Sequence, residues 1–93
     1  MNIFDSIQMY AGKWSEKSRR AFNDSEKAMV QSATVVSSQY GSSVCFFMKN
    51  GSQGFIPLSN DSNLKVGDTV DLEKAELITL SRPGDADIQR VSI

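Results

Sequence analysis

The stretch VCFFMKNGSQGFIPL, residues 44–58, decides the fold of this chain. A strongly apolar run opens it, Asn50-Gly51 closes that run, and a second apolar run follows and stops near Pro57. Asn-Gly is a favoured pair in the tight turns that join antiparallel strands. The stretch therefore predicts a β-hairpin.

Strand-like segments flank this hairpin on both sides. Residues 33–40 are rich in β-branched side chains, residues 69–81 begin with a clean alternation of polar and apolar side chains, and residues 88–93 follow a turn. The alternation slips near Lys74-Ala75, as a β-bulge would cause. Five strands with one hydrophobic face close best into a small barrel, because closure removes exposed edges. We therefore expect a mostly β fold built on a five-stranded barrel.

The first fourteen residues have a helical period. Their apolar side chains recur at spacings of four, three and four, on Ile3, Ile7, Tyr10 and Trp14. Such a stripe predicts an N-terminal amphipathic helix. A short helix must bury its stripe, so we expect it either to pack across one end of the barrel or to form an assembly surface for another protein or a second copy.

The segment that follows is polar and charged, and residues 15–25 fit a linker or a loose turn. Asn23 with Glu26 three positions later is a capping-box pattern, which predicts a second short helix that ends near Gln31. We therefore expect residues 1–31 to form a helical segment and linker, and residues 32–93 to form one compact barrel domain.

The charge balance limits what such a barrel can bind. The chain has 93 residues, enough for one domain, and a net charge of −1 from 10 basic and 11 acidic residues. Phosphate affinity comes largely from Lys and Arg, so this balance argues against a strongly electrostatic nucleic-acid binder and is compatible with a weak, stacking-based one. Residues 12–22 carry most of their charge as Lys and Arg, which leaves room for a local basic patch.

Cys45 is the only cysteine and lies in an apolar run, which predicts a small buried hydrophobe in a reducing compartment. No run approaches the roughly 20 apolar residues of a membrane span. The first residues also lack the basic and apolar pattern of a signal peptide. We expect a cytoplasmic protein with no membrane contact.

Catalytic residue types are scarce. The chain has no histidine, which removes His-based acid–base catalysis and His metal ligation, and Cys45 has no His partner for a thiol mechanism. Acidic side chains are ordinary at turns and on the polar side of strands. The nearest candidates for carboxylates that could hold Mg²⁺ or Ca²⁺ are the pairs Asp85 with Asp87 and Asp68 with Asp71. The sequence predicts no enzyme, no cofactor and no metal site.

Three motifs stand out between residues 34 and 81. They are YG at 40–41, GFIPLS at 54–59 and LKVGDTV at 64–70. In this order they resemble the RNA-binding oligonucleotide-binding (OB) repeats of the ribosomal protein S-one type, over about half the chain. The resemblance implies an OB-like barrel that binds single-stranded nucleic acid. Pro57 stands where many members of that family have a histidine that contacts RNA, and Ser43 stands where an aromatic often follows the Tyr-Gly pair.

Strand parity gives the candidate binding face. Phe46 and Ile56 suit the interior, which turns Phe47 and Phe55 outward, and Val91 and Ile93 inward leave Arg90 outward. The predicted nucleic-acid-binding residues are Tyr40, Phe47, Lys49, Phe55 and Arg90. Aromatic side chains flanked by cations bind single-stranded nucleic acid, because the π-face of every base can stack on an aromatic ring.

Two alternatives stay open at this point. The aromatic side chains can instead be core residues beneath the N-terminal helix, since aromatics are most often buried. The barrel can also serve as a protein-interaction or assembly module with no nucleic-acid role, because small barrels have many functions.

Overall fold

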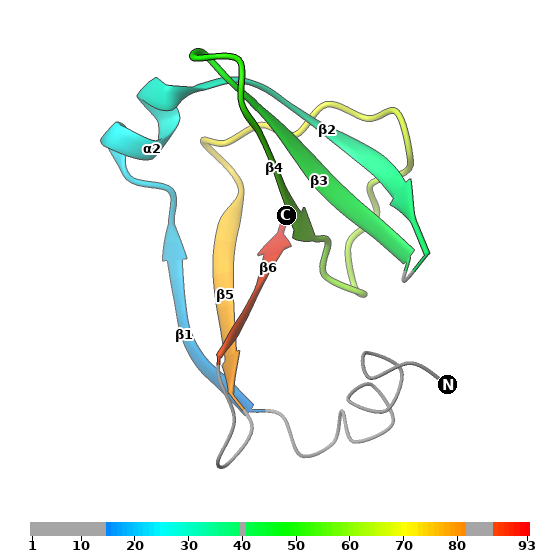
Figure 1. The fold of residues 1–93 in the computed structure, drawn as a ribbon. Helices are drawn as coiled ribbons and strands as arrows, with labels where there is room; N and C mark the ends of the chain where they lie inside the picture. Colours follow the sequence, from blue (N-terminus) through cyan, green and yellow to red (C-terminus); the bar gives the residue numbers. More distant parts are fainter. Residues whose placement is uncertain (1–14, 40, 82–86) are drawn as a thin grey trace.

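The computed structural model describes residues 15–39, 41–81 and 87–93. They form a mostly β fold of six strands and one short helix, arranged as two three-stranded antiparallel sheets (Figure 1). The elements are β1 (Ser15–Ala21), α2 (Asp24–Met29), β2 (Val30–Ser38), β3 (Gly41–Met48), β4 (Gln53–Pro57), β5 (Glu76–Ser81) and β6 (Ile88–Ser92). One sheet has the order β1-β5-β6 and the other the order β2-β3-β4.

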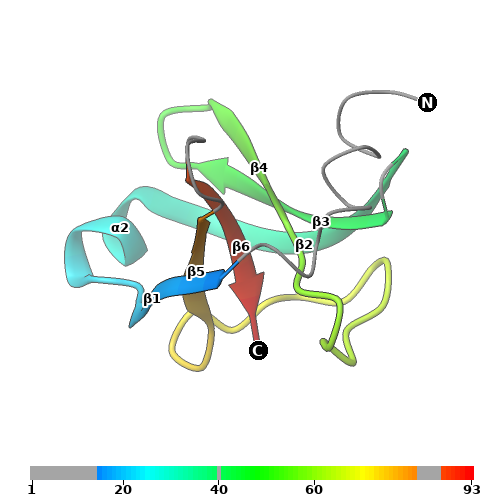
Figure 2. The same cartoon turned by 90° about the horizontal axis from the view of Figure 1, so that it is seen from below.

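One hydrophobic core lies between the two sheets. It receives side chains from both of them, and β5 and β6 run across the direction of β2 and β3 (Figure 2). The buried members are Phe22, Ala33, Val35, Val44, Phe46, Leu58, Val70, Ala75, Leu77 and Val91. A core shared in this way holds the sheets together by apolar burial.

The predicted hairpin is confirmed as β3 and β4. Its register pairs Cys45 with Phe55, and the Gly51 N–H donates to the Met48 carbonyl at 3.0 Å across the turn. Gly51 has a φ of 90°, a conformation that costs glycine little and other residues much more. The Asn50 side chain accepts a hydrogen bond from the Ser52 N–H at 2.9 Å. Both turn residues therefore act as the sequence predicts.

The predicted second helix is confirmed as α2, two residues shorter than expected. The Asn23 side chain accepts from the Glu26 N–H at 2.8 Å, and the Glu26 carboxylate accepts from the Asn23 N–H at 2.9 Å. These two bonds are the capping box, and they satisfy two N–H groups that the first turn leaves without helical partners. The helix ends at Met29, where β2 begins directly.

The prediction of a linker is wrong for residues 15–21, which form β1. This strand pairs with β5 from Ser15 opposite Ser81 to Ala21 opposite Glu76. All seven of its residues are exposed, so the strand buries no face and shows no alternation of polar and apolar side chains. Its pairing rests on backbone hydrogen bonds, which leave no pattern in the side chains.

The prediction of a closed five-stranded barrel is also wrong. Residues 69–81 do not form one long strand, because the N–H groups of Lys74 and Ala75 both donate to the Asp71 carbonyl at 3.0 Å and turn the chain. The expected bulge is therefore a turn, and β5 starts only at Glu76. Within the described residues, one isolated parallel bridge, Leu58–Val91, joins the end of β4 to β6, and an isolated antiparallel bridge, Thr34–Thr69, joins β2 to the connection between β4 and β5.

Ile93 differs from its predicted inward position. It follows the last residue of β6 and is 40% exposed. The predicted N-terminal helix, with Ile3, Ile7, Tyr10 and Trp14, lies outside the described residues. Where helices are described, none is long and apolar enough to span a membrane.

Candidate functional site

The outer face, meaning the side of β3 and β4 that carries Phe47 and Phe55, presents two aromatic rings to solvent. Phe47 is 39% exposed and Phe55 is 61% exposed. Their neighbours in sequence behave in the opposite way, since Phe46 is buried and Ile56 packs against the core. The predicted parity is therefore confirmed at both phenylalanines.

Register brings the two rings near each other. Cys45 lies opposite Phe55, and Phe47, two positions further along β3, lies opposite Gln53. Phe47 and Phe55 are therefore diagonal neighbours, about 7–8 Å apart and within reach of aromatic side chains. Cys45, opposite Phe55, shares their face but is only 3% exposed.

The two predicted cations lie at different ends of this face. Lys49 follows β3 directly and is exposed, and its backbone N–H donates to the Met29 carbonyl at 2.9 Å. Arg90 lies on β6 beyond the edge of β4. Because Leu58 and Val91 form a parallel bridge, the residues that precede them, Pro57 and Arg90, lie side by side on the same face.

The predicted local basic patch is neutralised across its described residues. Every Lys and Arg of β1 has a carboxylate partner within 4 Å, and so has the lysine of α2. The ion pairs are Lys17–Asp87 (3.0 Å), Arg19–Glu16 (3.2 Å), Arg19–Glu76 (3.1 Å), Arg20–Glu26 (2.6 Å) and Lys27–Glu73 (3.0 Å). Surface ion pairs add little stability, but they lower the positive potential that phosphates would meet.

Lys49 and Arg90 have no such partner among the described residues. Of the eight Lys and Arg side chains in the described ranges, the other two without an ion pair are Lys65 and Lys74, both exposed on the connection between β4 and β5. Burial lowers the pKa of the Arg90 guanidinium, and no carboxylate of the described ranges forms an ion pair with it. The side chain nevertheless stays charged at neutral pH, since the ordinary pKa of arginine is far above 7.

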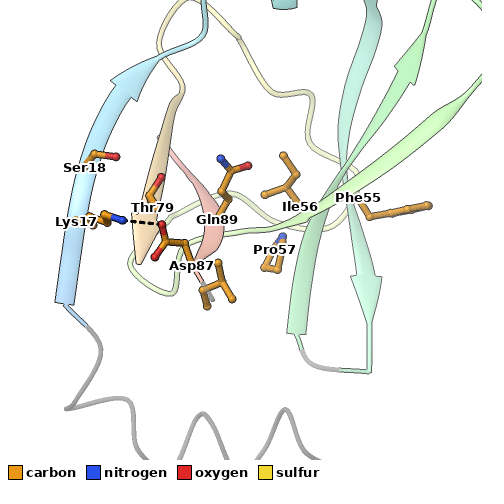
Figure 3. A pocket seen from close by; sticks show the side chains of 9 residues that line it. Lys17, Ser18, Phe55, Ile56, Pro57, Thr79, Asp87 and Gln89 are labelled. Carbon is orange, nitrogen blue, oxygen red and sulfur yellow. Dashed lines mark hydrogen bonds and ion pairs between the residues drawn. The ribbon is translucent and has the colours of Figure 1, made fainter. Parts of the chain in front are cut away.

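A cleft of about 840 Å³ opens beside Phe55, where β4 and β6 diverge from their bridge (Figure 3). Its walls mix apolar and polar side chains, and Lys17 and Asp87 form their ion pair at the side away from Phe55. The hydrogen bond from Lys17 and a second one from Ser81 lower the pKa of the Asp87 carboxyl. The lining residues are Lys17, Ser18, Phe55, Ile56, Pro57, Thr79, Asp87, Ile88 and Gln89.

An apolar cavity of about 350 Å³ adjoins this cleft. The two share Phe55, Ile56 and Gln89, and the cavity continues inward to Phe46 and Leu77 of the core. Its position follows from the incomplete closure between β4 and β6, which leaves the edge of the core accessible at one side of the domain.

Of the five predicted binding residues, the structure places four. Phe47, Phe55 and Lys49 come from the β3–β4 hairpin, and Arg90 comes from β6. Tyr40 lies outside the described residues. In the described part of the chain, no three Cys, Asp or Glu side chains cluster as a metal ion requires.

Sequence reasoning missed the polar side chains around Arg90. Ser42, Ser43 and Asn60 line a small recess with this arginine. They come from separate segments that are polar for ordinary reasons, so no spacing in the sequence singles them out. No protein-family model, no curated protein and no solved structure matches this chain.

Proposed function

We propose that this domain binds single-stranded nucleic acid weakly on the outer face of β3 and β4. The observation that carries the proposal is the exposure of two diagonal rings, Phe47 and Phe55. Lys49 and Arg90, which form no ion pair with any described residue, flank this face. Each base stacked on an aromatic ring contributes about 1–3 kcal/mol, and an arginine or lysine nearby attracts the phosphates.

The pairing of the strands supports an OB-like arrangement. An OB barrel is partly open and binds oligonucleotides through the face of its second and third strands. Counted from β2, the second and third strands here are β3 and β4, and these carry the two exposed rings. The parallel Leu58–Val91 bridge joins the end of β4 to β6 of the other sheet, and the antiparallel Thr34–Thr69 bridge holds the connection between β4 and β5 beside β2.

The binding is proposed to be weak because few charges take part. The net charge is −1, and carboxylates neutralise the basic side chains of β1. Affinity that comes mostly from stacking falls less steeply with salt than affinity that comes from phosphate contacts. A shallow salt dependence is therefore part of the proposal.

An NMR titration with short single-stranded DNA and RNA at low salt tests this function. The amide signals of β3 and β4 should shift, and the double variant Phe47→Ala/Phe55→Ala should abolish the shifts. Val66→Ala is the matched control, because Val66 is also apolar and 59% exposed but lies on the connection between β4 and β5. No shifts with either oligonucleotide at low salt would overturn the proposal.

A second candidate function, self-assembly through a strand edge, is favoured by the free side of β4. The Leu58 N–H donates to Ser42 at 2.9 Å, so the backbone of Phe55, three positions earlier, is turned away from β3. Between the described residues of β4 and β6, pairing is limited to the bridge at Leu58. An unpaired edge is a template for another strand, and a second copy offers the same edge. Sedimentation velocity at low and high protein concentration checks this, and a strict monomer at both would rule it out.

A further inference from the structure

A recess of about 70 Å³ lies where β3, the end of β4 and β6 meet. The Arg90 side chain lines it together with Ser42, Ser43, Pro57 and Asn60. A single water needs roughly 10–15 Å³ of such space, so the recess has room for a small polar group rather than one water alone.

Arg90 is the one described cation that is both partly buried and without a carboxylate partner. The other described cations without an ion pair are the lysines Lys49, Lys65 and Lys74. All three are exposed, so water solvates their charge. A partly buried guanidinium loses solvation and recovers it only from an opposite charge or from hydrogen-bond acceptors. The lowered pKa of Arg90 reflects this loss, because burial is its cause.

The rest of the recess supplies donors and no competing negative charge. The Ser42 hydroxyl and the Asn60 side-chain amide make no hydrogen bond within the described part of the chain, so both are available to a ligand. Ser43 is 8% exposed, and its hydroxyl donates to the Ser38 hydroxyl at 3.5 Å. No carboxylate belongs to the described lining.

We propose that this recess binds one phosphate group, with the Arg90 guanidinium as the charged ligand and Ser42 and Asn60 as neutral donors. Donors on three separate chain segments surround a tetrahedral oxyanion better than a planar carboxylate, and the guanidinium fork fits two phosphate oxygens at once. The inference rests on the proposed function in taking a phosphate of the bound strand as the occupant.

The location of the recess agrees with a single-stranded nucleic acid bound on the outer face. Arg90 lies beside Pro57, and Phe55 is two positions before Pro57 on the same face, about 7 Å along the strand. A phosphate held by Arg90 would therefore lie next to the base that stacks on Phe55. The recess would fix the sugar–phosphate backbone of the nucleic acid, and the Phe55 ring would hold the base.

Two probes separate this inference from the proposed function. Inorganic phosphate tests the recess alone, and a short oligothymidylate tests the recess as part of a strand site, both followed by amide shifts. Phosphate should shift the amides of Ser42, Ser43, Asn60 and Arg90. Arg90→Gln should weaken phosphate binding by about tenfold or more. Arg90→Lys should restore part of this affinity, because lysine keeps the positive charge but cannot donate two parallel N–H bonds to the phosphate.

For the oligothymidylate, Arg90→Gln should reduce the slope of log K against log salt by about 0.7, the value of one phosphate contact on a single strand. Lys65→Gln, which removes an exposed unpaired cation elsewhere, is the matched control and should leave phosphate affinity within about twofold. Thermal unfolding of each variant verifies that it folds.

The outcomes are distinguishable. If the oligonucleotide binds and Arg90→Gln leaves both its affinity and its salt slope unchanged, the recess is not a phosphate site and the proposed function stands. If phosphate fills the recess and the oligonucleotide does not bind, the site takes a free phosphate group, and nucleic acid is not the source of the phosphate. Phosphate shifts confined to amides outside the recess would overturn the inference.

Discussion

Phe55 and Cys45 face each other across β4 and β3 on the same side of the sheet, yet Phe55 is 61% exposed and Cys45 is 3% exposed. The difference follows from strand position. Cys45 is on the central strand, between Thr34 on β2 and Phe55 on β4, whereas Phe55 is on a strand that pairs along one edge only. Burial on this face is therefore set by neighbouring strands, and the Phe55 ring is left at the open edge.

The two faces of the hairpin should differ in their effect on stability. Phe55→Ala should change the free energy of unfolding by about 0.5 kcal/mol or less, because the side chain is mostly solvated. Phe46→Ala should cost about 3–5 kcal/mol, since Phe46 is buried and its ring packs against Phe22 at a centroid distance of 5.9 Å. Urea denaturation of both variants measures this. Equal losses would mean that Phe55 is a core residue.

Cys45 should be protected by the Phe55 ring. A thiol reagent should react slowly with the native protein and at once in denaturant, because the thiol is buried. Phe55→Ala should speed the native reaction by uncovering the cross-strand neighbour, whereas Val66→Ala should not. Fast labelling of the unmodified native protein would contradict the burial of Cys45.

The capping box should make stability depend on acid pH. The hydrogen bond from Arg20 and the one from the Asn23 backbone lower the pKa of Glu26 from 4.5 to about 2. Because the folded pKa is lowered, the carboxylate contributes fully to stability above about 4.5, and this contribution is lost as pH falls toward about 2.

An NMR titration of the Glu26 carboxyl checks this directly. Arg20→Gln should raise its midpoint toward the ordinary value, since the Arg20 hydrogen bond is the largest cause of the shift. Lys74→Gln is the control, because Lys74 is exposed and forms no ion pair in the described ranges. A midpoint near 4.5 in the unmodified protein would show that the capping box does not hold the carboxylate.

Two glycines of the hairpin should respond differently to alanine. Gly51 has a φ of 90° with nothing within 4 Å of an added Cβ, so Gly51→Ala should cost about 1–2 kcal/mol through backbone strain alone. Gly54 has the same open space without a positive φ, and Gly54→Ala should stay within about 0.5 kcal/mol. Thermal unfolding compares the two. Equal losses would contradict the turn conformation at Gly51.

The hairpin and the short helix could be predicted because their signals are local. Asn50-Gly51 dictates a turn through the backbone freedom of glycine, and Asn23 with Glu26 dictates a helix start through two hydrogen bonds three residues apart. The outward direction of Phe47 and Phe55 followed as well, because side chains alternate along a strand once its inner face is known.

Only the tertiary structure decided the pairing of β1 and the break in the expected fourth strand. β1 carries no apolar pattern, and its place beside β5 depends on backbone pairing with a strand far along the chain. The turn at Asp71 divides the expected fourth strand, and the contact between the end of β4 and β6 is a single long-range bridge, Leu58–Val91, which strand propensity does not predict.

The sequence by itself determined the β-rich class, the hairpin with its exposed rings and the capped helix, because each depends on residues close together in the chain. The tertiary structure alone decided that β1 joins a sheet, that the sheets stay open between β4 and β6, and that Arg90 shares a recess with Ser42 and Asn60. These arrangements bring together segments that are distant in sequence, and the free energy that selects among such pairings is spread over the whole core.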